Sequence, residues 1–148
     1  MARARILIAD DHKQMRDKVA LILASQFDVI GFVPYGRELL RAEYEMKPDV
    51  CVVDIFMPDI SGIDAVSSLK ASGSRAGVIF LAIDEDPDFL QAALEAGALG
   101  YVIKSRIATD LCAAVERALD GKVFISPSPR RVVRILKSSQ KEPSPFLP

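Results

Sequence analysis

Three carboxylates follow short apolar runs of the chain. Asp10 and Asp11 come directly after residues 5–9 (RILIA), and Asp54 closes residues 50–54 (VCVVD). Apolar runs without alternation are typical of strands that are buried on both faces of a parallel sheet. The carboxyl ends of such strands lie at one edge of the sheet, where α/β proteins bind ligands. We therefore expect the three carboxylates to meet at this edge, although Asp54 taken alone could equally be a turn residue or a helix cap.

Carboxylates that converge raise the pKa of at least one of them unless a cation compensates their charge. Oxygen ligands without His or Cys favour Mg²⁺, which needs only one or two carboxylates and keeps several waters. Lys104 follows the fifth apolar run and is expected at the same edge. Its ammonium could neutralise the carboxylates or hold an oxygen of a phosphoryl group. Mg²⁺ and a lysine around one acceptor carboxylate form the arrangement that phosphoryl transfer to an aspartate requires.

The elements that would position these side chains alternate along the chain. Apolar runs predict five strands, periodic apolar residues predict five helices, and the connections are short. The strands are expected at residues 5–9, 27–33, 50–54, 78–83 and 99–103, and the helices at residues 14–24, 37–46, 63–71, 87–96 and 108–119. This order predicts an α/β fold in which helices cover both faces of a parallel sheet.

The composition is typical of a soluble globular protein. The 148 residues suffice for one domain, and 50% of them are hydrophobic while 26% are charged. No apolar stretch has membrane-spanning length and no signal-peptide pattern is present, so we expect a cytoplasmic location and no membrane contact. Cys51 and Cys112 fall inside predicted elements as small buried side chains, and the single His argues against a zinc site.

Charge divides the chain into an acidic body and a basic tail. Residues 1–121 hold 13 Lys and Arg against 19 Asp and Glu, whereas residues 122–148 hold six against one. We predict a domain over residues 1–121 and a basic extension or linker over residues 122–148, with a short helix at residues 130–137. Such a tail could dock on an acidic partner or on nucleic acid, or could be a solvated linker.

Several short motifs together resemble the receiver domain of two-component response regulators, over about residues 4–121. They are the pair Asp10-Asp11, then Asp54 followed by Met57-Pro58 and Gly62, and finally residues 97–101 (GALGY) leading to Lys104. The resemblance depends on the order and spacing of these motifs, since each of them alone is weak. It implies a flavodoxin-like, doubly wound, five-stranded parallel sheet with the strand order 2-1-3-4-5.

The resemblance also implies a role for each residue of the site. Asp54 would accept a phosphoryl group from a histidine kinase or a phosphotransfer protein, and Lys104 would pair with that group. The Mg²⁺ ligands would be Asp11 and Asp54 directly, Asp10 through a water molecule, and the backbone carbonyl of Phe56. Tyr101 would be an aromatic switch. Such a protein is a signalling switch that assists its own phosphorylation and dephosphorylation, and not an enzyme.

Ala82 departs from the family pattern, in which a Thr or Ser ends the fourth strand and contacts the phosphoryl group. A hydrogen bond to a charged group contributes about 1.5–3 kcal/mol, so its loss would weaken the coupling between phosphorylation and conformation about tenfold or more. We hypothesise that the Ala82 methyl group lets Tyr101 turn inward without phosphate. The alternative interpretation is a pseudo-receiver that binds its partners independently of phosphorylation.

Two other chemistries fit the motifs less well. An aspartate-nucleophile phosphatase needs a second acid where Phe56 stands, and a nucleotide-binding protein needs a glycine-rich loop where the chain reads DDHKQM. His12 in that loop is interpreted as a polar loop residue and not as a general base.

Residues 97–127 are most similar to regulators with a C-terminal DNA-binding helix-turn-helix, which the residues after Pro129 are too few to form. Two interpretations stay open: a single-domain regulator that acts through protein contacts, or a receiver from a longer transcription factor. We do not expect this chain to bind DNA directly. By family analogy, the face over residues 87–120 is our prediction for a partner or homodimer surface.

Overall fold

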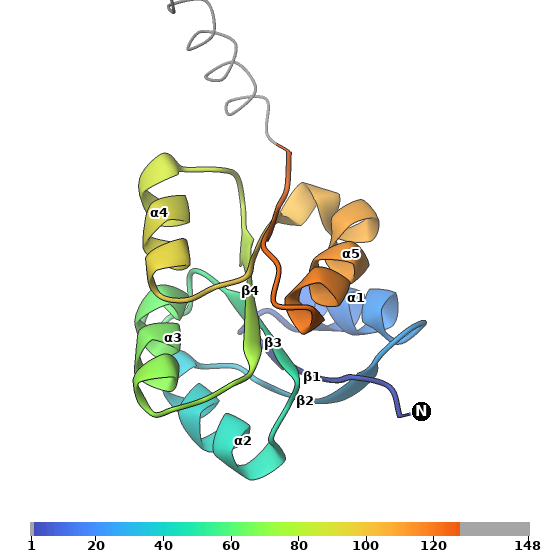
Figure 1. The fold of residues 1–148 in the computed structure, drawn as a ribbon, viewed down its shortest axis with the longest axis horizontal. Coiled ribbons are helices and arrows are strands. Elements are labelled where there is room, and N and C mark those ends of the chain that lie inside the picture. The colour runs from blue at the N-terminus through green and yellow to red at the C-terminus, as the bar shows by residue number, and fades with distance from the viewer. Residues whose placement is uncertain (1, 128–148) are drawn as a thin grey trace, which may run out of the picture.

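The computed structural model describes residues 2–127, which alternate between strands and helices (Figure 1). In chain order, with η for a 3-10 helix, the elements are β1 (Arg5–Ala9), α1 (Lys13–Leu23), β2 (Asp28–Val33), η1 (Gly36–Glu38), α2 (Leu39–Met46), β3 (Val50–Asp54), α3 (Gly62–Ala71), β4 (Gly77–Ala82), α4 (Pro87–Glu95), β5 (Gly100–Ile103), η2 (Lys104–Arg106), α5 (Ile107–Leu119) and β6 (Phe124–Ile125). Within the described residues, every strand and helix predicted from the sequence is present.

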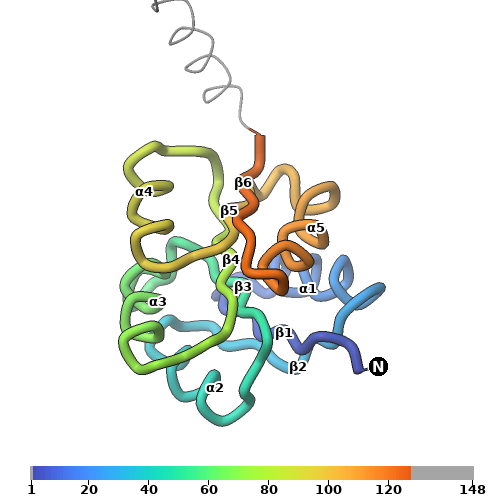
Figure 2. The backbone as a smooth tube through the Cα atoms, in the orientation of Figure 1, coloured from blue at the N-terminus to red at the C-terminus, as the bar shows by residue number. Residues whose placement is uncertain are grey.

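The sheet contains six parallel strands in the order β2-β1-β3-β4-β5-β6. The flavodoxin-like order 2-1-3-4-5 is therefore confirmed, whereas the predicted number of five strands is wrong by one. Gly121, with a φ of +71°, turns the chain after α5, and β6 then pairs with the outer edge of β5 between α4 and α5 (Figure 2). The sheet thus continues past residue 121, where the domain was predicted to end. The predicted helix at residues 130–137 lies outside the described residues.

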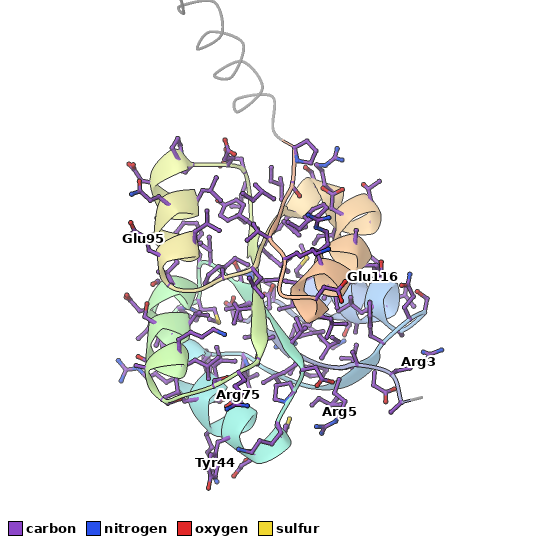
Figure 3. All side chains as sticks on the ribbon, in the orientation of Figure 1. Arg3, Arg5, Tyr44, Arg75, Glu95 and Glu116 are labelled. Atoms are coloured by element: carbon purple, nitrogen blue, oxygen red, sulfur yellow. The ribbon has the colours of Figure 1, made fainter. Side chains whose placement is uncertain are left out.

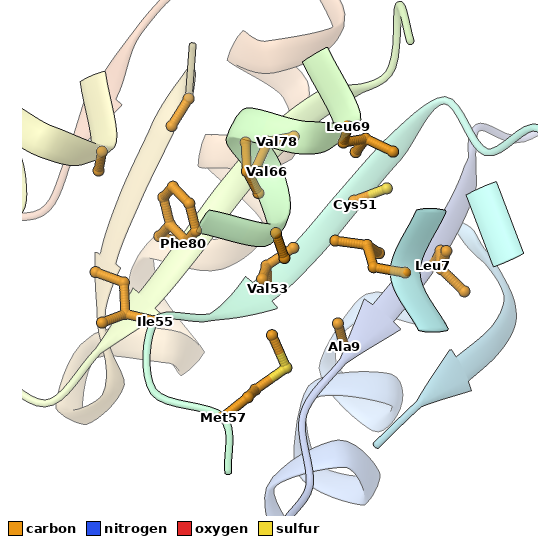
Figure 4. Packing of buried hydrophobic residues seen from close by; sticks show 14 of the residues in the cluster. Leu7, Ala9, Cys51, Val53, Ile55, Met57, Val66, Leu69, Val78 and Phe80 are labelled. Atoms are coloured by element: carbon orange, nitrogen blue, oxygen red, sulfur yellow. The ribbon is translucent and has the colours of Figure 1, made fainter. Parts of the chain in front are cut away.

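The core has two halves because side chains alternate between the two faces of the sheet. Leu7, Cys51 and Phe80 face α2, α3 and α4 in one half, which Figure 4 shows from close by. Ile8 and Val52 face α1 and α5 in the other half. Figure 1 shows the same division, with α2, α3 and α4 on one side of the sheet and α1 and α5 on the other. β3 and β4 are buried along their whole length, which explains why their sequences lack alternation.

The register of the sheet brings the proposed site residues to one edge. Ala9 at the end of β1 lies opposite Val53 of β3, so Asp10 and Asp54 leave neighbouring strands at the same level. β4 joins β3 to β5, and Lys104 follows the last residue of β5. The helices of the described region, residues 2–127, are too short or too polar to cross a membrane.

Candidate functional site

Three carboxylates meet at the carboxyl edge of the sheet, as the sequence predicts. Asp10 is fully buried, Asp54 is 2% exposed, and Asp11 retains partial exposure. One ligand atom from each of these residues and from His12 can be chosen so that all lie within 4.8 Å of one another. The arrangement is compact enough for a single cation to bridge the carboxylates.

Lys104 supplies a positive charge at this edge. Its Nζ donates to Asp54 Oδ2 over 3.1 Å, and the Phe56 backbone N–H donates to Asp54 Oδ1 over 3.1 Å. Burial raises the pKa of Asp54 above its usual value; the Phe56 N–H and Lys104 oppose this rise, and the nearby Asp10 adds to it. Lys104 and Phe56 thus leave the Asp54 charge partly uncompensated, which favours a further cation.

The chemistry of the donor atoms fits a hard cation. Asp10 Oδ1 accepts the His12 backbone N–H over 2.8 Å, whereas its buried Oδ2 has no hydrogen-bond partner among the described residues. A buried carboxylate oxygen without a partner is costly, and a divalent cation would satisfy it. The His12 side chain is 68% exposed, with Nδ1 3.1 Å from Asp11 Oδ1 and 3.4 Å from Asp10 Oδ1. It lies at the rim of the carboxylates, in agreement with its interpretation as a polar loop residue.

Tyr101 is 1% exposed and points into the molecule. Its hydroxyl donates to the backbone carbonyl of Asp84 over 3.1 Å, and burial raises the pKa of Tyr101. Ala82 ends β4 in the same core half as Tyr101 and is also buried. The inward position of Tyr101 therefore coexists with a methyl group at residue 82.

Two contacts at the site had no signal in the sequence. Arg16 of α1 donates to the Asp10 carbonyl over 3.2 Å, and its guanidinium lies 4.9 Å from the centre of the Phe32 ring. Phe56 contacts Phe89 of α4 edge to face, with 5.2 Å between the ring centres. Arg16 and Phe32 are 16 residues apart in the sequence, and Phe56 and Phe89 are 33 apart, so local periodicity could not pair them.

A cavity of about 720 Å³ lies at the opposite end of the strands, between the ends of α2 and α3. It is lined by Tyr44, Lys47, Asp49 and Arg75 among others, and Figure 3 shows Tyr44 and Arg75 projecting beside α2. Since Asp49 precedes β3 and Asp54 ends it, this cavity is separate from the carboxylate site.

Comparisons with known proteins agree with this geometry. The family model described as "Response regulator receiver domain" matches residues 6–116. The response regulator GacA of Pseudomonas aeruginosa is 31% identical over 96% of this chain and 68% of its own length. The uncharacterized transcriptional regulatory protein YvfU of Bacillus subtilis is 34% identical over 83% of this chain and 62% of its own length. The chain thus spans about three fifths of the length of several curated relatives that it matches.

Solved structures give the same result. A two-component response regulator of the LuxR family from Aurantimonas sp. SI85-9A1 superposes with a TM-score of 0.82 at 27% identity, covering 95% of this chain and all of that chain. The isolated REC domain of RcsB from Salmonella enterica, solved with the phosphomimetic BeF3⁻, superposes with a TM-score of 0.79 at 25% identity over 88% of this chain and 98% of that chain. From the family match, the shared fold and the convergent carboxylates, the chain belongs to the response regulator receiver domains of two-component systems.

Proposed function

We propose that this receiver accepts a phosphoryl group on Asp54 from a histidine kinase or a phosphotransfer protein, in the presence of Mg²⁺. The observation that carries the proposal is the position of the Asp54 carboxylate. It is buried, its Oδ2 lies 3.1 Å from Lys104 Nζ, and the carboxylates of Asp10 and Asp11 are next to it. A buried acid whose charge is only partly compensated is suited to react with, and hold, an electrophilic phosphorus.

In the proposed step, a carboxylate oxygen of Asp54 attacks the phosphorus of the donor phosphohistidine. The new O–P bond forms as the P–N bond breaks, and the electron pair of the broken bond leaves with the imidazole of the donor. Asp11 and Asp54 would bind Mg²⁺ directly, Asp10 through a water molecule, and Phe56 through its backbone carbonyl. When bound there, Mg²⁺ would neutralise charge on the phosphoryl oxygens as the group is transferred.

Lys104 would change partners during the transfer. Before it, the ammonium neutralises Asp54; afterwards, Asp54 is an acyl phosphate and its negative charge lies on the phosphoryl oxygens, where Lys104 would follow it. In that state Ala82 offers no hydroxyl to the phosphoryl group. We propose that Ala82 and Tyr101 form the switch of this receiver, and that Tyr101 depends less on the phosphoryl group than it would with a Thr at residue 82.

The output of the switch would be a change of partner or of self-association. A homodimer through the face over residues 87–120 remains our proposal for one output, and β6 adds to this face because it covers the outer edge of β5. Residues 122–148 are proposed as a basic extension or linker, of which residues 124–125 belong to the sheet. Direct DNA binding is proposed only for a longer chain that carries an output domain.

Intact-mass spectrometry after incubation with acetyl phosphate and Mg²⁺ tests the proposed function. We expect the mass of one phosphoryl group to be added to the wild-type chain, and no addition without Mg²⁺ or in Asp54→Asn. Asp49→Asn, at the other end of β3, is the matched control and should be phosphorylated like the wild type. The proposal would be contradicted if the folded wild-type chain gained no phosphoryl group. It would also be contradicted if the Asp54→Asn chain gained one.

A further inference from the structure

A buried carboxylate lies six residues after Lys104 in the chain. Asp110, in the first turn of α5, is 5% exposed and accepts two hydrogen bonds from Arg106, over 2.7 Å from Nε and 3.2 Å from Nη2. It also accepts the hydroxyl of Ser126 over 2.7 Å. Ser126 is fully buried and follows β6 directly. We call Arg106, Asp110 and Ser126 the clasp.

The clasp holds the chain on both sides of Lys104. Ser126 Oγ accepts the backbone N–H of Ile103 over 3.1 Å, and Ile103 is the residue before Lys104. Arg106 is the last residue of η2, which Lys104 begins. One carboxylate, that of Asp110, is therefore linked to the backbone before Lys104 through Ser126 and to the side chain of Arg106, two residues after Lys104.

The Ser126 hydroxyl takes the place of a strand carbonyl that β6 is too short to supply. β6 pairs with β5 over only two residues, and the backbone N–H groups of Phe124 and Ser126 donate to the carbonyls of Leu99 and Tyr101 over 2.8 and 2.9 Å. Beyond this point the Ile103 N–H faces a side chain instead of a strand carbonyl. A buried network in which every member has a partner orders the groups that it joins. In agreement with this, although burial raises the pKa of Asp110, the hydrogen bonds from Arg106 and Ser126 hold it below its usual value.

We infer that Ser126 and Asp110 are positioning residues for Lys104, which they hold in the place from which its ammonium reaches Asp54 and the phosphoryl group. The inference rests on the proposed function. The Lys104 side chain is long and has many rotamers, and it is only 19% exposed where it reaches Asp54 over 3.1 Å. The direction in which the side chain leaves the backbone then decides whether Nζ arrives at the reacting atoms. A displacement of the Lys104 backbone by a fraction of an ångström or more therefore lowers the rate of phosphorylation, which depends on the position of Nζ.

The clasp should affect the lysine and not the cation. Asp10, Asp11 and Asp54 come from β1 and β3, and none of them contacts Arg106, Asp110 or Ser126 through a described hydrogen bond. Loss of the clasp is therefore expected to slow phosphorylation without lowering the affinity for Mg²⁺, because Lys104 is a cation beside Asp54 and does not bind Mg²⁺. A general loss of structure would lower both.

The experiment measures the rate constant of phosphorylation by acetyl phosphate, together with Mg²⁺ affinity by isothermal titration calorimetry in the absence of phosphodonor. We expect Ser126→Ala to lower the rate constant about tenfold, and Asp110→Asn, which keeps the side-chain volume, to act in the same direction. Neither substitution should lower Mg²⁺ affinity. In a Lys104→Ala background Ser126→Ala should have no further effect, because the group that it positions is gone.

Ser74→Ala is the matched control. Ser74 also donates to a carboxylate, that of Glu43 over 2.8 Å, and accepts a backbone N–H, that of Ala76 over 3.2 Å, but at the opposite end of the sheet. Ser74→Ala should be phosphorylated at the wild-type rate. The inference is overturned if Ser126→Ala and Asp110→Asn both keep the wild-type rate while Lys104→Ala is slow, or if Ser126→Ala slows the Lys104→Ala background by the same factor as the wild type. A wild-type chain that is not phosphorylated on Asp54 would overturn the proposed function and the inference together.

Discussion

Asp54 ionises at a cost to the stability of the folded protein. Burial raises its folded pKa above the usual 3.8. The folded state therefore binds this proton more tightly than the unfolded state does, and stability decreases as pH rises from 3.8 through the folded pKa. We expect Asp54→Asn, measured without divalent cations, to raise the Tm at pH 7, and the gain to vanish as the pH approaches 3.8. Each 1 kcal/mol corresponds to about 3 °C in Tm for a chain of this size.

Asp59 provides the control of opposite sign for that prediction. Partial desolvation acts to raise the pKa of Asp59. Backbone N–H groups, including those of Arg37 and Gly36, donate to the carboxylate and hold its pKa below 3.8. Its contribution to stability is therefore present above pH 3.8 and is lost as the pH falls through the folded pKa. Asp59→Asn should lower the Tm at pH 7.

Mg²⁺ gives a further test at Asp54. If Asp54 is a Mg²⁺ ligand as proposed, Mg²⁺ should raise the Tm of the wild type more than that of Asp54→Asn, because a cation that binds only the folded chain stabilises it. An Asp54→Asn chain less stable than the wild type at pH 7 without Mg²⁺ would refute the argument.

Ala82 gives a second prediction at the scale of a residue. We expect Ala82→Thr to increase the change that Tyr101 undergoes when beryllofluoride binds, because a hydroxyl at residue 82 adds a hydrogen bond to the phosphoryl analogue worth about 1.5–3 kcal/mol. Fluorine NMR of fluorotyrosine-labelled protein reports on this change, and Tyr101→Phe assigns the signal among the three tyrosines. Val has the shape of Thr without the hydroxyl, so Ala82→Val should not show the larger change of Tyr101 that is expected of Ala82→Thr. Equal responses of Ala82→Thr and the wild type would remove Ala82 from the switch.

At the scale of elements, the start of α3 packs directly against the end of β3. A Cβ atom on Gly62 would lie 2.3 Å from the backbone carbonyl oxygen of Asp54, and the Gly62 N–H donates to the carbonyl of Ile55 over 2.7 Å. Only a glycine can begin the helix this close to Asp54. The Ser61 side chain, which accepts the N–H of Asp64, caps the same helix.

Gly62→Ala should therefore destabilise the protein, by about 1–3 kcal/mol in urea denaturation, although Gly to Ala in an ordinary helix stabilises. The backbone of Asp54 must shift to admit the methyl group, so phosphorylation by acetyl phosphate should also slow. Gly77→Ala is the control, because its Cβ would lie 3.4 Å from the nearest atom, the Cβ of Ala118. If Gly62→Ala were as stable as Gly77→Ala, the close contact between α3 and Asp54 would be of no consequence.

The strands and helices could be predicted because their signals are local. VCVVD, VIFLAI and the periodic helices are readable within ten residues, and strand ends then bring Asp10, Asp54 and Lys104 together without further information. The sequence carries little signal for β6, because a strand of two residues is too short to show an alternation of apolar and polar side chains. Phe124 and Ile125 form a strand only because they pair with the edge of β5. The contacts of Arg16 with Phe32, of Phe89 with Phe56 and of Ser126 with Asp110 depend on partners that the fold brings near, for which the sequence holds no local signal.

At the scale of the whole molecule, the boundary of the folded unit is decided by the sixth strand. The sequence places a change of charge and composition at residue 121, yet the sheet and the clasp continue to Ser126. Phe124 packs against one half of the core and Ile125 against the other, so the segment closes the sheet between α4 and α5. We therefore propose that the folded unit extends beyond the acidic body.

Truncation of the chain tests where the folded unit ends. A chain of residues 1–121 should be less stable than the full chain by on the order of 3 kcal/mol, because it loses the burial of two apolar side chains and leaves Asp110 without the Ser126 hydroxyl. A chain of residues 1–127 keeps these contacts and should be more stable than the chain of residues 1–121 in urea denaturation. Equal stability of the two truncated chains would place the boundary at residue 121 after all, whereas a loss confined to the shorter chain assigns β6 and the clasp to the receiver itself.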